Sequence, residues 1–164
     1  MALVVEDGTG LADAEAYISV ADADAYFAAR GNTAWAALTD EQKEQALRLG
    51  TDYMGQVYGP RWCGERATST QALDWPRIDA CNIASDVVPV AVKRANAELA
   101  VRSATTGALL ADAGAQVKQE TVGPISVTYA DGARQYVKYS AVDATLASAG
   151  LLCKGGSQIP VVRA

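Results

Sequence analysis

Residues 39–60 read TDEQKEQALRLGTDYMGQVYGP, and this stretch carries the signals for both ends of a helix. Thr39 and Gln42 form a capping-box pattern, in which each side chain can pair with a backbone N–H of the other residue. Gly59-Pro60 predicts the end of the helix, because proline cannot continue one. Between the two ends, apolar residues recur at helical spacing and predict one buried stripe. They are Ala46, Leu49, Tyr53 and Val57.

Similar signals predict three further helices, over residues 20–30, 89 to about 105, and 141–149. Ser19 can cap the first of these and Gly31 can end it, while Pro89 suits the first turn of the next. The apolar positions expected to face inward are Val20, Ala23, Phe27, Val92, Ala95, Leu99, Val142 and Leu146.

Charged residues at a spacing of four mark the outer faces of two of these helices. Glu44 and Arg48 are expected to form an ion pair, since residues four apart are neighbours on a helix surface. Arg94, Glu98 and Arg102 repeat the same spacing and predict a solvated ladder of charges.

The remaining segments are not helical in pattern. Residues 61–86 show no period and predict a long ordered loop, held to the core by Trp62 and Trp75. Alternating residues at about 117–129, followed by Asp131-Gly132, predict a β-hairpin. The sequence thus indicates a mainly α (α+β) fold: a small bundle of about four helices with a β-hairpin and an extended C-terminal tail. We expect one helical domain over residues 1–152 and a flexible docking tail over 153–164.

The composition argues against several classes of function. The chain has 14 Lys and Arg against 19 Asp and Glu, a net charge of −5, and such a chain repels phosphates unless a local basic patch overrides the field. It has no histidine, the commonest general base and a frequent metal ligand, so we expect no enzyme, metal site or cofactor. The three cysteines lie far apart, which favours free thiols in a reducing compartment. No signal peptide or apolar stretch of roughly 20 residues is present, so synthesis in the cytoplasm is expected.

Three patterns suggest binding sites and also have plainer interpretations. Gly8-Thr9-Gly10 could be a phosphate-binding loop, but it lacks the lysine and the third glycine and is more simply a turn. The acid pairs, Glu6 with Asp7 and Asp22 with Asp24, could hold a metal but are more simply solvated carboxylates. The third pattern is an aromatic and basic surface for single-stranded nucleic acid, or else buried indoles with paired arginines. Its residues are Arg61, Trp62, Arg66, Trp75 and Arg77.

Several stretches, in order along most of the chain, resemble one family from tailed-phage and prophage genomes. These stretches are residues 5–10 (VEDGTG), 16–27 (AYISVADADAYF), 30–35 (RGNTAW), 61–66 (RWCGER), 71–77 (QALDWPR), 88–100, 118–124 (KQETVGP) and 129–132 (YADG). Members carry the label DnaT-like, which implies binding of single-stranded DNA. They also resemble the head–tail connector (adaptor) proteins of long-tailed phages, helical domains that form a ring beneath the portal.

The resemblance to adaptors implies a structural virion protein at the neck, between the portal and the stopper or tail-completion protein. It implies self-association into a ring, expected to be a dodecamer, through which the genomic DNA passes without specific binding. The acidic balance favours this function over the DnaT-like alternative. Portal docking is expected from the apolar end of the tail, which comprises Gln158, Ile159, Pro160, Val161, Val162 and Arg163. A second interface is expected on the hairpin, at Lys118, Glu120, Ile125, Val127 and Tyr129.

Overall fold

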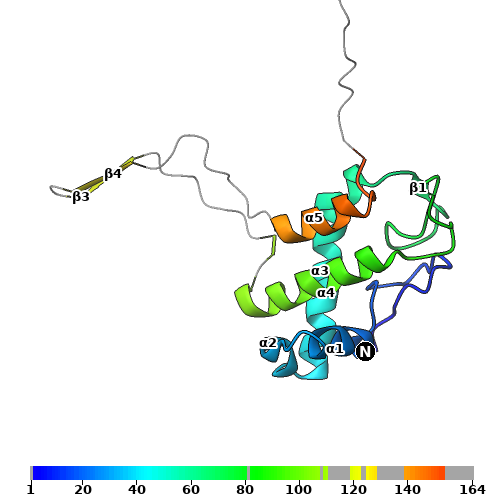
Figure 1. Cartoon of the computed structure of the whole chain (residues 1–164), viewed down its shortest axis with the longest axis horizontal. Helices are drawn as coiled ribbons and strands as arrows, with labels where there is room; N and C mark the ends of the chain where they lie inside the picture. The colour runs from blue at the N-terminus through cyan, green and yellow to red at the C-terminus, as the bar shows by residue number, and fades with distance from the viewer. Residues whose placement is uncertain are drawn as a thin grey trace, which may run out of the picture.

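The computed structural model describes residues 2–80, 82–107, 109–110, 119–122, 125–128 and 139–153. Five helices and two pairs of short strands are found in these residues, and the predicted mainly helical fold with a hairpin is confirmed (Figure 1). The helices are α1 (Val20–Ala28), α2 (Thr33–Ala36), α3 (Asp40–Tyr58), α4 (Val90–Thr106) and α5 (Ser140–Ser148). The strands are β1 (Glu65–Arg66), β2 (Arg77–Ile78), β3 (Gln119–Val122) and β4 (Ile125–Thr128).

Helices α3 and α4 cross at the centre of the helical body (Figure 1). They approach closely at Gly50, where an added Cβ would lie 3.0 Å from the backbone oxygen of Asn96. The buried Asn96 side chain stabilises this crossing: it accepts the backbone N–H of Tyr17 at 3.1 Å and donates to the carbonyl of Leu47 at 3.0 Å. Both ends of its amide are therefore paired, as a buried polar group requires.

Two apolar clusters lie along the α3–α4 pair. One gathers α1, α2 and the first half of α3, with Phe27, Trp35 and Leu47 fully buried. The other gathers the end of α3, the long loop and α5, with Tyr58, Trp75 and Leu146 fully buried. Burial of such side chains contributes roughly 1.5–3 kcal/mol each, so the aromatic residues supply much of the core of this alanine-rich chain.

The predicted ends of α1 and α3 are close to the observed ones. Ser19 accepts the backbone N–H of Asp22, and Thr39 and Gln42 form the complete capping box. One predicted core position is wrong, since Leu49 is 48% exposed. The contact with α4 is made instead by the face of α3 that contains Leu47, Gly50 and Met54, which is rotated away from Leu49. The predicted inward positions of α4 and α5 are all buried.

The segment after α3 contains more regular structure than the sequence predicts. A turn of 3-10 helix (Gly59–Arg61) follows α3, and β1 pairs antiparallel with β2 with Arg66 opposite Arg77. The strands are two residues long, which is too short to produce a recognisable alternation. Helix α2 was likewise not predicted, because its four residues span barely one turn.

The predicted hairpin is present as β3 and β4, with Glu120 opposite Val127 and Val122 opposite Ile125. In Figure 1 this strand pair stands apart from the helices. Residues 154–164, the predicted docking tail, lie outside the described residues. No described helix is both long and apolar enough to cross a membrane.

Candidate functional surfaces

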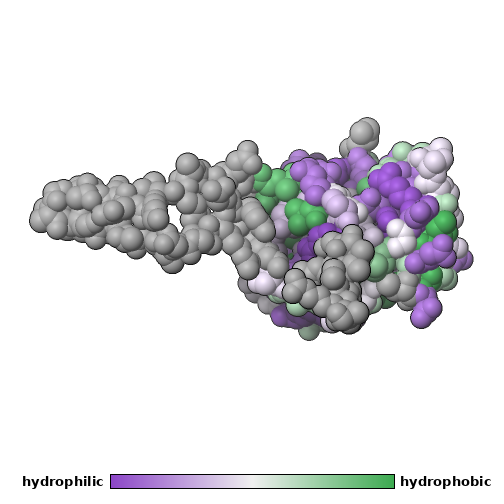
Figure 2. All heavy atoms as spheres, turned by 90° about the horizontal axis from the view of Figure 1, so that it is seen from above, coloured by the Kyte–Doolittle hydropathy of each residue, from purple (hydrophilic) through white to green (hydrophobic). Residues whose placement is uncertain are grey.

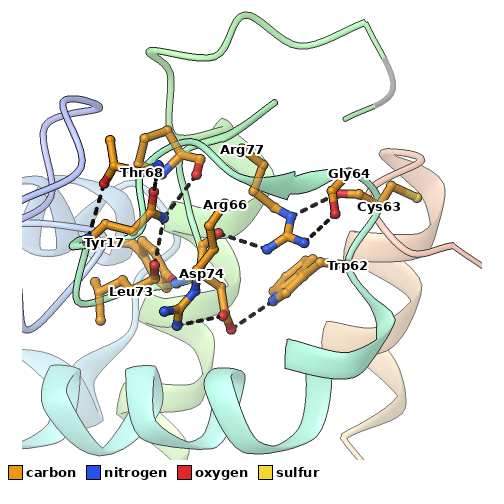
Figure 3. A network of polar contacts seen from close by, with 11 residues as sticks. Tyr17, Trp62, Cys63, Gly64, Arg66, Thr68, Leu73, Asp74 and Arg77 are labelled. Carbon is orange, nitrogen blue, oxygen red and sulfur yellow. Dashed lines mark hydrogen bonds and ion pairs between the residues drawn. The ribbon is translucent and has the colours of Figure 1, made fainter. Parts of the chain in front are cut away.

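The loop between α3 and α4 is held by a network of polar contacts centred on Asp74 (Figure 3). Its carboxylate accepts the indole N–H of Trp62 at 3.2 Å and a guanidinium N–H of Arg66 at 3.2 Å. Its backbone N–H donates to the hydroxyl oxygen of Tyr17 at 3.0 Å, and burial raises the pKa of that hydroxyl. These contacts join the segment before α1 (residues 2–19), which we call the N-terminal arm, to the loop.

Arg77 is the second centre of the same network (Figure 3). Its guanidinium donates to the carbonyls of Cys63 at 2.8 Å, Gly64 at 2.5 Å and Asp74 at 3.1 Å. Burial lowers the pKa of this group, and its hydrogen bonds are all to backbone oxygens. Arg77 therefore joins the two sides of the β1–β2 loop.

The two tryptophans and Arg77 of the predicted aromatic and basic surface are thus buried, whereas Arg61 is partly exposed and Arg66 is exposed. Trp62 and Trp75 are 5% and 0% exposed, and their rings pack edge to face. Arg61 is paired with Asp143 at 2.8 Å. Because a base stacks on an exposed ring face, these two indoles offer no platform to single-stranded DNA. Trp75 Nε1 is a buried donor with no partner among the described residues.

The N-terminal turn is closed by a buried carboxylate. Glu6 accepts the backbone N–H groups of Gly8, Gly10 and Leu11, each at 2.9 Å. A phosphate-binding loop would need such N–H groups for its ligand, and here they are already paired. The residues are a turn, and Glu6 is a buried structural acid rather than a solvated one. Among the described residues there is no group of three possible metal ligands.

A disulfide joins Cys63 to Cys153, 90 residues apart, where free thiols had been expected. The two segments also pair through their backbones, because the N–H of Cys63 donates to Leu151 and that of Cys153 donates to Arg61. Sequence spacing could not reveal this pair, since the fold alone brings the end of α3 beside the end of α5. Cys81 lies outside the described residues.

An arginine-lined groove of about 310 Å³ lies between α1, α4 and α5. We call it the arginine groove. Its charged residues are Arg30, Arg94, Glu98 and Arg102, and Tyr26, Ala95 and Val142 also line it. Ala95 and Val142 are buried beneath it. Three guanidinium groups against one carboxylate make this groove locally basic in a chain that is acidic as a whole.

The groove is organised around Glu98 and Tyr26. Glu98 accepts the hydroxyl of Tyr26 at 3.1 Å and a guanidinium N–H of Arg102 at 2.6 Å. Arg30 lies over the Tyr26 ring, 3.6 Å from its centroid. Burial, followed by the charge of Glu98, raises the pKa of the Tyr26 hydroxyl. The sequence predicted the charged ladder on α4, but it could not show that α1 places an aromatic ring and a further arginine beside it.

A second hollow, of about 280 Å³, has the opposite charge. We call it the acidic hollow; it is lined by Glu15, Glu41, Glu44, Gln45 and Arg48. Arg48 pairs with Glu15 at 2.9 Å and with Glu44 at 3.4 Å. The hydrogen bond from Arg48 lowers the pKa of Glu15. The predicted Glu44–Arg48 pair is therefore present, with an additional carboxylate from the N-terminal arm.

The residues predicted to bind partners are described only in part. Gln158, Ile159, Pro160, Val161, Val162 and Arg163 lie outside the described residues, as do Lys118 and Tyr129. The backbones of Glu120, Ile125 and Val127 lie in the β3–β4 pair. The docking roles of all these residues stay predictions.

Comparison with known protein families gives a match that covers residues 1–164. The matched family is described as "Putative DnaT-like ssDNA binding protein". The chain belongs to this family. No curated protein and no solved structure matches, so the comparisons name no phage connector.

The DnaT-like family description refers to single-stranded DNA, whereas the buried tryptophans of this member offer no ring face on which its bases could stack. The arginine groove has the positive charge that DNA binding would require.

Proposed function

We propose that this DnaT-like family member is a head–tail adaptor, a non-enzymatic structural protein of the virion neck. The observation that carries the proposal is the β3–β4 hairpin, which is inserted between α4 and α5 and stands apart from the helices (Figure 1). In a two-stranded pair, each strand has an unpaired edge whose N–H and C=O groups can pair with another chain. Strand addition of this kind is a common way for proteins to dock.

The chemistry of the helical body is consistent with assembly rather than catalysis. Among the described residues, the buried charged groups all have partners: Glu6 and Arg77 form hydrogen bonds with backbone atoms, and Lys43 pairs with the carboxylate of Asp24. The net charge of −5 suits a ring that surrounds DNA without gripping its phosphates. The proposed partners are further copies of this chain in a dodecamer, the portal protein, and a stopper or tail-completion protein.

Deletion of the gene from the phage or prophage that encodes it tests this function. Electron microscopy of the lysate should show filled heads without tails, or heads that have lost their DNA. A plasmid copy of the gene should restore tailed particles, which excludes effects on neighbouring genes. Normal tailed particles in the deletion lysate would contradict the adaptor function.

Binding of single-stranded DNA is the second candidate, favoured by the family description and by the arginine groove. A titration of fluorescent oligo-dT at low salt tests it. Binding tighter than about micromolar, which weakens steeply as salt is added, would support this candidate, because phosphate contacts release counterions. Arg94→Glu should then abolish binding, and Lys93→Glu, the same change of charge at the adjacent position outside the groove, should weaken it less.

A further inference from the structure

The arginine groove and the acidic hollow carry opposite charges and share no residue. The groove holds three guanidinium groups and one carboxylate. The hollow holds three carboxylates and one guanidinium group. Helices α1, α4 and α5 line the groove, whereas the N-terminal arm and α3 line the hollow. One copy of the chain therefore presents two separate surfaces of complementary charge.

On each surface, one charged group has no hydrogen bond or ion pair to any other residue that the structure describes. Arg94 is exposed and makes no hydrogen bond or ion pair within the described part of the chain, although Arg102 beside it is paired with Glu98. Glu41 is exposed and likewise has no ion pair or hydrogen bond to a described residue. The other acids of the hollow are paired with Arg48. Arg94 and Glu41 are thus the groups most available to a molecule outside this chain.

Each unpaired group also has an exposed aliphatic residue on the same helix face. Val90, which is 60% exposed, lies one turn before Arg94. Leu49 lies two turns after Glu41, with Gln45 between them. Figure 2 shows that hydrophobic residues occur in small separate patches among hydrophilic ones on the face drawn there. Protein–protein contacts combine an apolar core with a polar rim, and each of these pairs supplies one residue of either kind.

We propose that the arginine groove of one copy docks against the acidic hollow of a second copy, with Arg94 facing Glu41. A contact between two different surfaces is heterologous, so each added copy presents a free surface for the next. Such a contact closes into a ring when the rotation between copies permits. The inference rests on the proposed adaptor function and identifies the surfaces through which the ring forms.

Charge favours a second copy over nucleic acid as the occupant of the groove. A strand of DNA carries only negative charge, and the groove contains Glu98 at its centre as well as the three arginines. The net charge of −5 opposes the approach of a polyanion. The same net charge does not prevent a contact in which a local positive surface meets a local negative one.

Sedimentation velocity of the full chain over a range of concentrations at low salt tests the inference. The wild type should associate, and added salt should weaken the association because it screens exposed charges. Arg94→Glu and Glu41→Arg should each weaken association at least about tenfold. The double variant Arg94→Glu/Glu41→Arg should restore it, since the charges are exchanged. Lys93→Glu is the matched control and should associate like the wild type, and circular dichroism verifies that every variant is folded.

Other outcomes would overturn the inference. These are a wild type that is monomeric at every concentration, single variants that associate normally, or a double variant that does not recover. If Arg94→Glu instead abolishes binding of fluorescent oligo-dT and leaves self-association unchanged, the groove is a binding site for nucleic acid. Complementation of the gene deletion separates this inference from the adaptor function. If the wild-type gene and the Arg94→Glu gene both restore tailed particles, the adaptor function stands and the proposed contact is wrong.

Discussion

The indole N–H of Trp62 donates a 3.2 Å hydrogen bond to Oδ2 of Asp74 (Figure 3). The same carboxylate accepts a guanidinium N–H of Arg66 through its other oxygen. One side chain thus satisfies a buried donor and an exposed cation at once. This relationship explains why an otherwise irregular loop stays packed against the end of α3.

Replacement of Asp74 by alanine should destabilise the fold by about 1–3 kcal/mol, because the buried indole N–H loses its acceptor. Arg66→Ala should lower the free energy of unfolding by less than about 1 kcal/mol, because the Arg66 side chain is 45% exposed and surface ion pairs contribute little to stability. Urea denaturation of Asp74→Ala and Arg66→Ala compares the two. Equal losses of unfolding free energy would assign the effect to the ion pair instead of the indole.

Gly50 lies where α3 meets α4, and a side chain there has no room. An added Cβ would lie 3.0 Å from two atoms of Asn96 and 3.1 Å from the backbone N of Ala100. Gly50→Ala should therefore destabilise the protein by about 1–3 kcal/mol, although alanine is the better helix former. Gly55→Ala is the matched control in the same helix, because its Cβ would meet only Asp74 Oδ2 at 3.9 Å. It should stabilise the protein by up to about 1 kcal/mol. Thermal melts of both variants show directly whether each substitution raises or lowers the melting temperature.

The Cys63–Cys153 disulfide closes a segment of 90 residues. Closing a loop of that length can stabilise a fold by up to about 4 kcal/mol. We expect the melting temperature to fall on addition of a reductant, and to fall equally in Cys63→Ser without one. Alkylation of the unfolded, unreduced protein should modify only Cys81. Modification of all three cysteines before reduction would contradict the bridge.

Glu15 makes stability depend on acid pH through its contact with Arg48. Because this contact lowers the pKa of Glu15 in the folded chain, its contribution is present above the unfolded value of about 4.3. It is lost as the pH falls through the folded pKa. The wild type should therefore melt above Glu15→Gln near neutral pH, and the difference should disappear once the pH is below the folded pKa of Glu15. In an Arg48→Met background, Glu15→Gln should have little effect at any pH. A difference that persists there would assign it to another neighbour.

The C-terminal tail provides a test of the proposed portal docking. A chain that lacks residues 155–164 should keep its melting temperature, because the disulfide at Cys153 precedes the deletion. It should nevertheless fail to restore tailed particles when it replaces the wild-type gene. If tailed particles are restored, the portal-docking element lies in another part of the chain. Replacement of residues 117–129 by a short glycine-rich linker would then test the hairpin.

The sequence predicted most of the fold wherever the signal was local. The capping box at Thr39 and Gln42, the Ser19 cap and the inward face of α4 depend on residues within a few positions of one another. Leu49 was assigned wrongly, because periodicity shows that a helix has an apolar side but not how its partner is oriented. Helix α2 and strands β1 and β2 were not predicted, since they are too short to establish a period.

The sequence alone determined a helical chain with a hairpin, an acidic balance and no histidine, because these properties depend on composition and local spacing. Only the tertiary structure decided which candidate sites are internal and which surfaces are available. It placed Trp62 and Trp75 in the core, paired Cys63 with Cys153, and brought Arg30, in the turn after α1, into the same groove as Arg94 of α4. Each of these outcomes joins residues distant in the chain, and the contacts that join them arise only when the helices pack.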